Sequence, residues 1–149
     1  MDQDDLISTL NNLVETSRDG EEGFRTSAEH AKDAQLKSLF QNRADSCAAA
    51  VRELQEIVLA NGGTPSESSS VSGTLHRRWV DIKSMVTGRD DVAILNEVER
   101  GEDVAVASYK KALAQGLPSD VQVLVERQYQ GTLRNHDQIK QLRNQLRAS

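Results

Sequence analysis

Two glutamates follow glycines at matching places in the sequence, and their carboxylates could bind a metal ion or an arginine. The sequence around Gly20-Glu21 recurs around Gly101-Glu102, and in both copies the glycine falls on the apolar stripe of a helix-like segment. Glycine costs about 1 kcal/mol in a helix relative to alanine, and a buried carboxylate needs a partner, so neither residue suits a plain hydrophobic seam. The repeat therefore predicts two inward carboxylates that require a cation.

A metal ion is one cation that would satisfy these carboxylates. A dinuclear centre in a helical bundle takes one Glu from each of two helices and a Glu-x-x-His motif from each of the other two, because residues i and i+3 share a helix face. His136 is present, but Leu133 stands three residues before it, and segment 34–60 contains no histidine. The metal hypothesis therefore has Glu21, Glu102 and His136 as ligands of iron or manganese and lacks the other ligands.

Arg43 is the other available cation. It falls on the inward stripe of segment 34–60, where its planar guanidinium could bridge Glu21 and Glu102. The polar side chains expected to complete this buried network are Gln128, Asn135 and His136. In this hypothesis the protein binds no cofactor, and the network replaces a metal site. A third hypothesis, in which these side chains face solvent, stays open.

The elements that would position these residues are four long amphipathic helices. Apolar residues at helical spacing predict them at about 4–31, 34–60, 91–115 and 119–147. Asp33 is placed to cap the second helix, and Asn61-Gly62-Gly63 to end it. The expected inward stripe of the third helix is Ile94, Val98, Gly101, Ala105, Ser108 and Ala112.

The links between these helices predict the topology. The first and last links are short, so each helix pair must be antiparallel, whereas the middle link is long and carries a shorter amphipathic helix at about 73–87. A link of that length can return along the whole bundle and set the second and third long helices parallel. We therefore expect one all-α domain, residues 1–149, with a ferritin-like four-helix bundle of two antiparallel hairpins joined by a crossover. A simple bundle with a decorated loop is the alternative.

Four motifs spread along the chain carry a resemblance to a known family. They are Asp19-Gly20-x-x-Gly23-Phe24, Leu36-Lys37-x-Leu39-Phe40, Leu75-His76-Arg77-x-Trp79-x-Asp81 and Glu99-Arg100-Gly101-Glu102-Asp103. In their order and spacing the whole chain resembles a bacterial ferritin-like four-helix-bundle family known as a domain of unknown function. The two Gly-Glu steps also look like helices one and three of ferritin-like proteins such as rubrerythrin. The resemblance implies a bacterial setting, and analogy with metal-handling relatives suggests a stress response.

The composition of the chain limits the cellular location and the classes of binding partner that we expect. A chain of 149 residues with a net charge of −5 and a pI near 5.2 favours neither nucleic acid nor an acidic membrane as partner. No apolar run approaches the roughly 20 residues of a membrane span. With Cys47 as the one cysteine and an acidic N-terminus unlike a signal peptide, we expect a cytoplasmic protein.

The function expected from these observations is that of a non-enzymatic bundle with a degenerate di-iron site, acting by interaction or assembly. A helical bundle allows self-association into a homodimer or higher homo-oligomer, and the sequence identifies no protein partner. The alternative is a ferritin-like metal-binding protein, an iron or manganese store or an oxidoreductase, that uses Glu21, Glu102 and His136. The sequence has no nucleophile-and-base pair, nucleotide loop or zinc-ligand spacing, so an enzymatic role rests on the polar centre alone.

Overall fold

The chain forms long α-helices in the residues that the computed structural model describes, 1–67 and 91–148. They are α1 (Gln3–His30), α2 (Ala34–Ala60), α4 (Asp91–Leu113) and α5 (Ser119–Ala148). These described ranges contain no β-strand, and the expected all-α four-helix bundle is confirmed. The observed bounds differ from the expected ones by at most two residues. The short helix expected at about 73–87 lies outside the described residues.

Aspartates cap the first two helices. The Asp2 side chain accepts a hydrogen bond from the Asp5 amide at 2.9 Å, and Asp33 accepts one from the Gln35 amide at 2.7 Å. Each carboxylate satisfies an amide that the first helical turn leaves unpaired and lies at the positive end of the helix dipole. After α2, Gly62 has a φ of 80°, which is a left-handed conformation that glycine adopts without a steric penalty.

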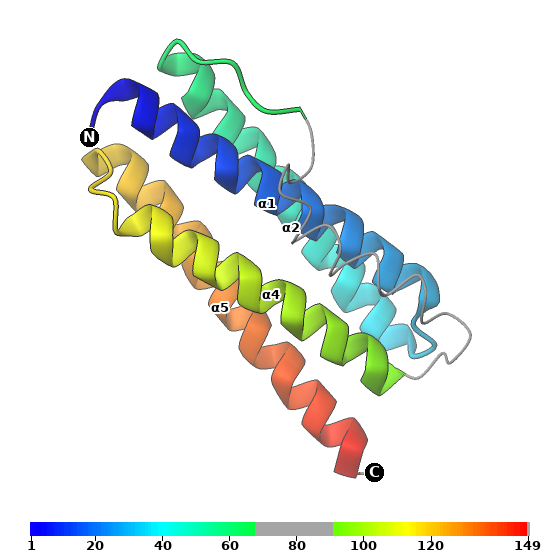
Figure 1. Cartoon of the computed structure of the whole chain (residues 1–149). Coiled ribbons are helices and arrows are strands. Elements are labelled where there is room, and N and C mark those ends of the chain that lie inside the picture. Colours follow the sequence, from blue (N-terminus) through cyan, green and yellow to red (C-terminus); the bar gives the residue numbers. More distant parts are fainter. Residues whose placement is uncertain (68–90, 149) are drawn as a thin grey trace.

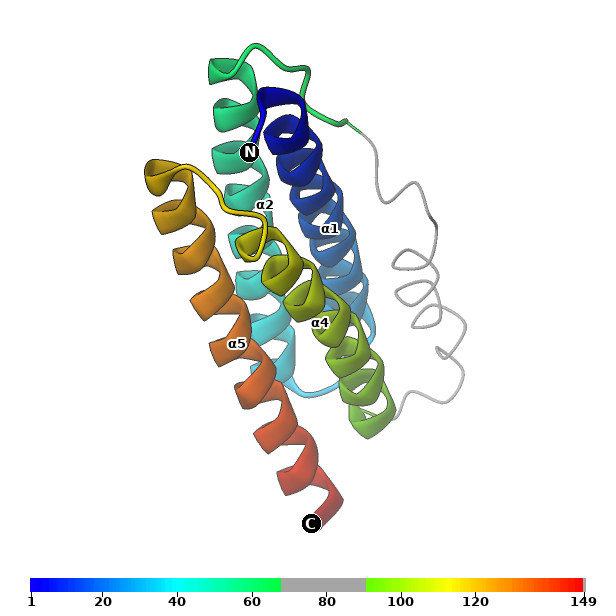
Figure 2. The same cartoon turned by 60° about the vertical axis from the view of Figure 1, so that its left-hand side comes forward.

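The helices pack as two antiparallel hairpins. One hairpin is α1 with α2, and the other is α4 with α5 (Figure 1). Figure 2 shows the four helices from a second side. The hairpins contact each other mainly through α1 and α4, whereas α2 and α5 make the weakest contact among the described helices. The side of the bundle between α2 and α5 is therefore its least tightly packed side.

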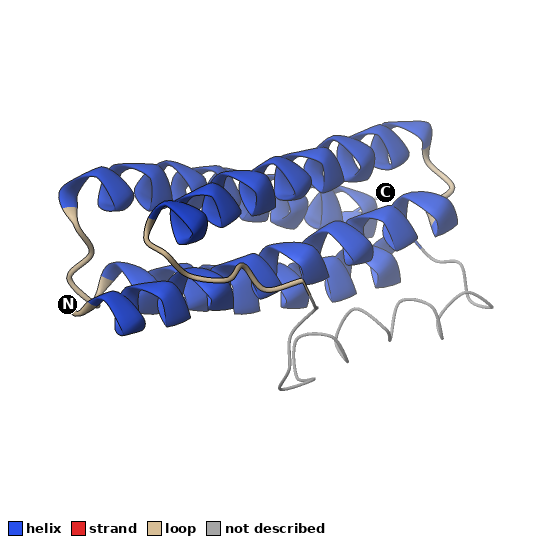
Figure 3. Ribbon diagram, turned by 90° about the horizontal axis from the view of Figure 1, so that it is seen from above, coloured by secondary structure: helices blue, strands red, loops and turns tan. Residues whose placement is uncertain are grey.

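Contacts at the bundle ends establish that α2 and α4 are parallel. The backbone amides of Lys32 and Asp33 donate to the Asp91 carboxylate at 3.0 and 3.1 Å, so α4 begins beside the start of α2. This is the arrangement that the long connection requires and that a simple up-and-down bundle lacks. Residues 61–67 then turn back along the bundle (Figure 3), where the Ser66 amide donates to Asn11 Oδ1 at 2.8 Å.

The core consists of two apolar clusters with a polar layer between them. One cluster is built around Phe24, Phe40, Leu95, Val98 and Ile139, and the other around Leu10, Leu13, Leu54, Val58 and Val125. Full burial of such side chains contributes about 1.5–3 kcal/mol each, so the clusters hold the four helices at fixed positions around the polar layer. Among the described residues, no helix has a stretch long and apolar enough to cross a bilayer.

Candidate polar site at the bundle centre

A cavity of about 300 Å³ lies in the polar layer, and all four helices contribute to its walls. The walls from α1 and α4 are closed, and Glu102 and Tyr109 are buried there. The exposed wall residues are Ser46 on α2 and Arg127 and Arg134 on α5. The cavity therefore opens to the surface between α2 and α5, where the two hairpins pack least tightly.

The space around two glycines of the cavity wall, Gly20 and Gly131, differs. A Cβ on Gly20 would lie 3.1 Å from Cys47 Sγ, so Gly20 permits the close approach of α1 to α2. A Cβ on Gly131 would meet only Arg134 Nη2, at 3.8 Å, so Gly131 leaves open space. Burial raises the pKa of Cys47 to about 12, which keeps this free thiol protonated and unreactive at neutral pH.

Arg43 supplies a cation to Glu102, the carboxylate in the cavity wall. The Glu102 side chain is 2% exposed, and its Oε1 lies 3.9 Å from Arg43 Nε. Arg43 Nη2 donates to Thr132 Oγ1 at 3.1 Å, and the guanidinium carbon lies 5.8 Å from the centroid of the Phe24 ring. Ion pair, hydrogen bond and cation–π contact together fix the guanidinium at the centre of the bundle.

The charge at Glu102 is only partly compensated. Burial raises the pKa of its carboxyl above the ordinary value of 4.5, against the opposing effects of Arg43, Asn135 and His136; Asp103 raises it further. Glu102 Oε2, Arg43 Nε and Asn135 Nδ2 are buried without a hydrogen-bond partner among the described residues. The network therefore offsets only part of the cost of burying Glu102 and leaves several of its polar atoms without a hydrogen bond.

The raised pKa of Glu102 makes stability depend on pH. Because the folded state holds this proton more tightly than the unfolded state, the stabilisation is complete below about pH 4.5 and is lost as the pH rises through the folded pKa. Glu102→Gln removes this loss. We therefore expect the free energy of unfolding of Glu102→Gln, measured in urea, to increase relative to that of wild type as the pH rises from 4.5 to 8. A difference that stays constant over this range would contradict the account, and exposed Glu56→Gln should follow wild type.

Glu21 lies apart from this network. It follows the stripe glycine by one residue, which is about 100° around the helix, and its side chain is 30% exposed. Its carboxylate pairs with Arg25 at 3.1 Å, and Arg25 also reaches Asp45 at 3.3 Å. The expected bridge from Arg43 to both carboxylates is therefore half formed: Arg43 pairs with Glu102, while Glu21 belongs to a surface ion-pair group.

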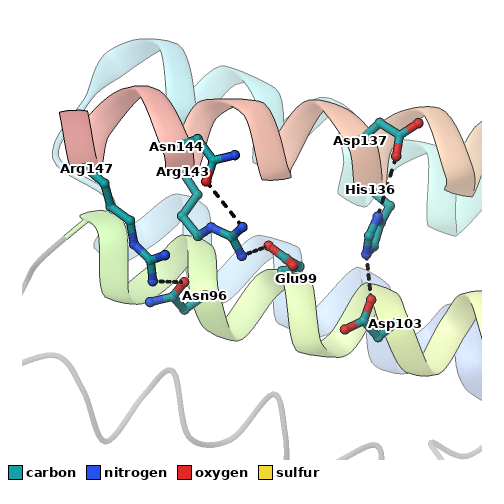
Figure 4. A network of polar contacts seen from close by, with 8 residues as sticks. All are labelled: Asn96, Glu99, Asp103, His136, Asp137, Arg143, Asn144 and Arg147. Carbon is teal, nitrogen blue, oxygen red and sulfur yellow. Dashed lines mark hydrogen bonds and ion pairs between the residues drawn. The ribbon is translucent and has the colours of Figure 1, made fainter. Parts of the chain in front are cut away.

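His136 joins a second polar group, between α4 and α5 (Figure 4). Its Nε2 lies 2.5 Å from Asp103 Oδ1, and its Nδ1 lies 3.8 Å from Asp137 Oδ1. One turn away, Glu99 pairs with Arg143. The ligand atoms of Glu99, Asp103 and His136 lie within 4.8 Å of one another, a spacing that could hold a metal ion.

The three predicted metal ligands thus do not form one site, because each has a different partner. Glu21 pairs with Arg25, Glu102 lies beside Arg43, and His136 contacts Asp103. Within residues 1–67 and 91–148, the carboxylate and imidazole group with ligand spacing contains His136 but neither of the two glutamates.

Tyr109 is a member of the polar layer that sequence reasoning missed. Its hydroxyl is buried and donates to Gln128 Oε1 at 2.9 Å, while Gln128 Nε2 donates to Glu53 Oε1 at 3.1 Å. Burial raises the pKa of Tyr109 to about 12, so the hydroxyl stays a donor. Gln128 therefore connects Tyr109 with Glu53 rather than completing the Arg43 pair. The sequence did contain a signal for this position: Tyr109 follows Ala105 of the expected inward stripe by four residues, which places the two on the same helix face.

Comparisons with known proteins support the fold. The family model described as "Domain of unknown function (DUF2383)" matches residues 5–115. A solved structure from Anabaena variabilis, a two-domain protein containing DJ-1/ThiJ/PfpI-like and ferritin-like domains, matches with a TM-score of 0.81 at 14% identity. The match covers 100% of this chain and 39% of the other, so this chain spans well under half of that protein. At this identity the likeness shows the fold, and the expected ferritin-like bundle is confirmed. Among curated proteins, none matches this sequence.

Proposed function

The chain belongs to the family described as a domain of unknown function (DUF2383), and we propose that it is a non-enzymatic ferritin-like bundle in which a buried polar network replaces a dinuclear metal centre. The observation that carries this proposal is the Arg43 guanidinium beside Glu102, at 3.9 Å, in the centre of the bundle. A fixed positive charge there neutralises the carboxylate and repels a metal cation at short range. The network then has a structural role where a metal centre would have a catalytic one.

The residues on the facing helices support the same proposal. A dinuclear carboxylate centre needs a Glu-x-x-His motif on two helices. Helix α2 has no histidine, and α5 has Leu133 three residues before His136. Helix α2 instead contributes Arg43 and Cys47, and the Cys47 thiol is protonated at neutral pH because burial raises its pKa to about 12. These side chains do not supply the anionic oxygen ligands that a di-iron centre requires.

In this proposal the protein acts through its surface, by contact with another protein or by self-association. The large apolar side chains exposed in the described part are Met1, Leu59 and Val123, so the contact would be mainly polar. A cytoplasmic location and a bacterial stress response belong to the same proposal, by analogy with metal-handling relatives. Sedimentation velocity over a range of protein concentrations would distinguish a homodimer or higher homo-oligomer from a monomer.

Oxidation of ferrous iron tests the non-enzymatic role. Purified protein is mixed with Fe²⁺ in air, and the absorbance of ferric product is followed for wild type and Glu102→Gln. We expect both to match the rate in buffer, because no metal is held at Glu102. Oxidation that is faster with wild type and returns to the buffer rate in Glu102→Gln would contradict the proposal.

One observation favours the alternative of a metal-binding protein. Glu99, Asp103 and His136 offer two carboxylates and an imidazole within 4.8 Å of one another, a donor set that suits manganese or iron. The Arg143 pair with Glu99 would have to open first. Titration with Mn²⁺ tests this site: binding that is lost in His136→Ala but kept in His30→Ala would support it, and equal binding in the two variants would exclude it.

A further inference from the structure

We propose that Arg143 and a divalent metal ion compete for the Glu99 carboxylate at the contact between α4 and α5, and that the bound metal loosens the last turns of α5. The other two ligands of the metal would be Asp103 and His136. This inference rests on the alternative given above, a metal-binding protein, and adds a regulatory role to that site. It does not depend on the polar network around Glu102.

The polar group between α4 and α5 has the donors and the spacing of a metal site (Figure 4). Glu99 and Asp103 are four residues apart on α4 and so project from the same face of the helix. Their ligand atoms and that of His136 all lie within 4.8 Å of one another. Ligands lie about 2.0–2.2 Å from a small divalent ion, so two ligands of one ion are about 3–4 Å apart. Small side-chain movements therefore suffice to bring the three onto one ion.

The imidazole of His136 is oriented as in many metal sites. Its Nε2 lies 2.5 Å from Asp103 Oδ1, inside the group, whereas its Nδ1 lies 3.8 Å from Asp137 Oδ1 on the other side of the ring. A metal-bound histidine commonly has a carboxylate beside its second nitrogen, which fixes the orientation of the ring. Nε2 is thus the nitrogen that His136 presents to a metal ion at Glu99 and Asp103.

Arg143 supplies the positive charge that a metal ion would bring to this group. Its Nη1 pairs with Glu99 Oε2, and the two side chains are only 15% and 17% exposed. One arginine compensates one carboxylate, whereas a divalent ion compensates both Glu99 and Asp103. The same carboxylates therefore have two alternative cations, and Arg143 cannot keep its contact with Glu99 when a metal ion takes that oxygen.

The surroundings of Arg143 make its ion pair exchangeable. Arg143 Nη2 donates to Asn144 Oδ1 at 3.3 Å, but Nε is buried without a hydrogen-bond partner among the described residues. An unsatisfied buried donor destabilises the paired arrangement, and Nε would regain water once the guanidinium left Glu99. Metal binding would thus replace a partly satisfied ion pair with metal–ligand bonds.

The same exchange changes how the end of α5 is held. The Arg143 pair with Glu99 joins this end to α4, as does the hydrogen bond from Arg147 Nη2 to Asn96 Oδ1 at 3.2 Å. Beyond Ile139, no described residue of α5 is buried, so apolar packing holds these turns less firmly than the rest of the helix. Release of Arg143 therefore removes a tie from the part of α5 that opens most easily.

Titration of purified protein with MnCl₂, followed by the electron paramagnetic resonance of free Mn²⁺, tests the competition. The relevant binding is the part that His136→Ala abolishes. We expect Arg143→Met to bind this Mn²⁺ about tenfold more tightly than wild type, because a charged hydrogen bond no longer has to be opened. Arg147→Met removes a neighbouring positive charge that does not pair with Glu99, and it should bind as wild type does.

Amide hydrogen exchange of the same proteins tests the link to α5. Saturating Mn²⁺ should speed exchange at residues 141–148 of wild type by about threefold, because the Arg143 tie is lost. In Arg143→Met these amides should exchange at the faster rate without metal, and Mn²⁺ should change them little. Residues 132–138 around the ligand His136 should not exchange faster with Mn²⁺ in either protein.

Four results would overturn the inference: no His136-dependent Mn²⁺ binding by wild type, equal affinities of wild type and Arg143→Met, an equal gain in Arg147→Met, or exchange at residues 141–148 that is unchanged or slower with Mn²⁺. The first result also removes the metal-binding alternative. The other three leave that site in place and exclude the role of Arg143. None of them bears on the proposed polar network, which metal bound at Glu102 would contradict.

Discussion

Arg43→Met is expected to lower the free energy of unfolding at pH 8 by about 3–5 kcal/mol, the usual cost of removing one partner of a buried ion pair. The variant leaves the Glu102 carboxylate, which is 2% exposed, without the cation 3.9 Å away. It also removes the hydrogen bond to Thr132 and the contact with the Phe24 ring. The loss should shrink at lower pH, because a protonated Glu102 no longer needs the positive charge. Urea unfolding measures both effects.

The double variant Arg43→Met/Glu102→Gln isolates the charge interaction. If Arg43 mainly compensates Glu102, removing the carboxylate as well should recover part of the stability, giving a coupling of about 1–3 kcal/mol. Arg52→Met, on the exposed side of α2, serves as the control and should change stability by less than about 0.5 kcal/mol. Additive effects of the two single changes would show that Arg43 and Glu102 do not act as a pair.

Phe24→Ala should destabilise the protein by about 3–5 kcal/mol and more than Phe40→Ala does. Both rings are fully buried, with centroids 6.1 Å apart, so each truncation leaves a similar cavity in the same apolar cluster. Phe24 also makes a cation–π contact with Arg43, whose guanidinium carbon lies 5.8 Å from the centroid of the Phe24 ring. We expect the extra loss in Phe24→Ala to be about 0.5–2 kcal/mol.

Phe40→Ala is the matched control for this comparison, and thermal unfolding of the two variants at pH 8 supplies the measurement. Equal losses, or a larger loss in Phe40→Ala, would mean that the ring of Phe24 does not help to hold Arg43. The result bears directly on how the cation is fixed at the bundle centre.

The helices and topology could be predicted because local signals agreed with the global fold. Apolar residues at helical spacing defined the four long helices, and Asp33 caps α2 as expected. The long middle link predicted that α2 and α4 are parallel, and the bonds from Lys32 and Asp33 to Asp91 are consistent with it. Helical spacing, a capping residue and the length of a link can each be read directly from the sequence, and all three agree with the same fold.

The centre was harder to predict because it depends on how each helix is rotated about its own axis. Glu21 and Glu102 both follow a stripe glycine, yet Glu21 reaches the surface while Glu102 is buried. Helix α4 is rotated so that Gly101 and Glu102 both face inward, and the same rotation buries Tyr109 in place of the expected Ser108. Two similar stretches of sequence thus have different surroundings, which only the packing of neighbouring helices determines.

The metal content of wild type and Glu102→Gln tests the central claim most directly. Both proteins are exposed to Fe²⁺ and Mn²⁺ without oxygen, passed through a desalting column and analysed by elemental mass spectrometry. In the proposed function Arg43 takes the place of a metal beside Glu102, so we predict the same metal content per chain in the two proteins, whatever the Glu99, Asp103 and His136 group retains. Metal that is bound by wild type and lost in Glu102→Gln would contradict the replacement of a metal centre by the Arg43 network.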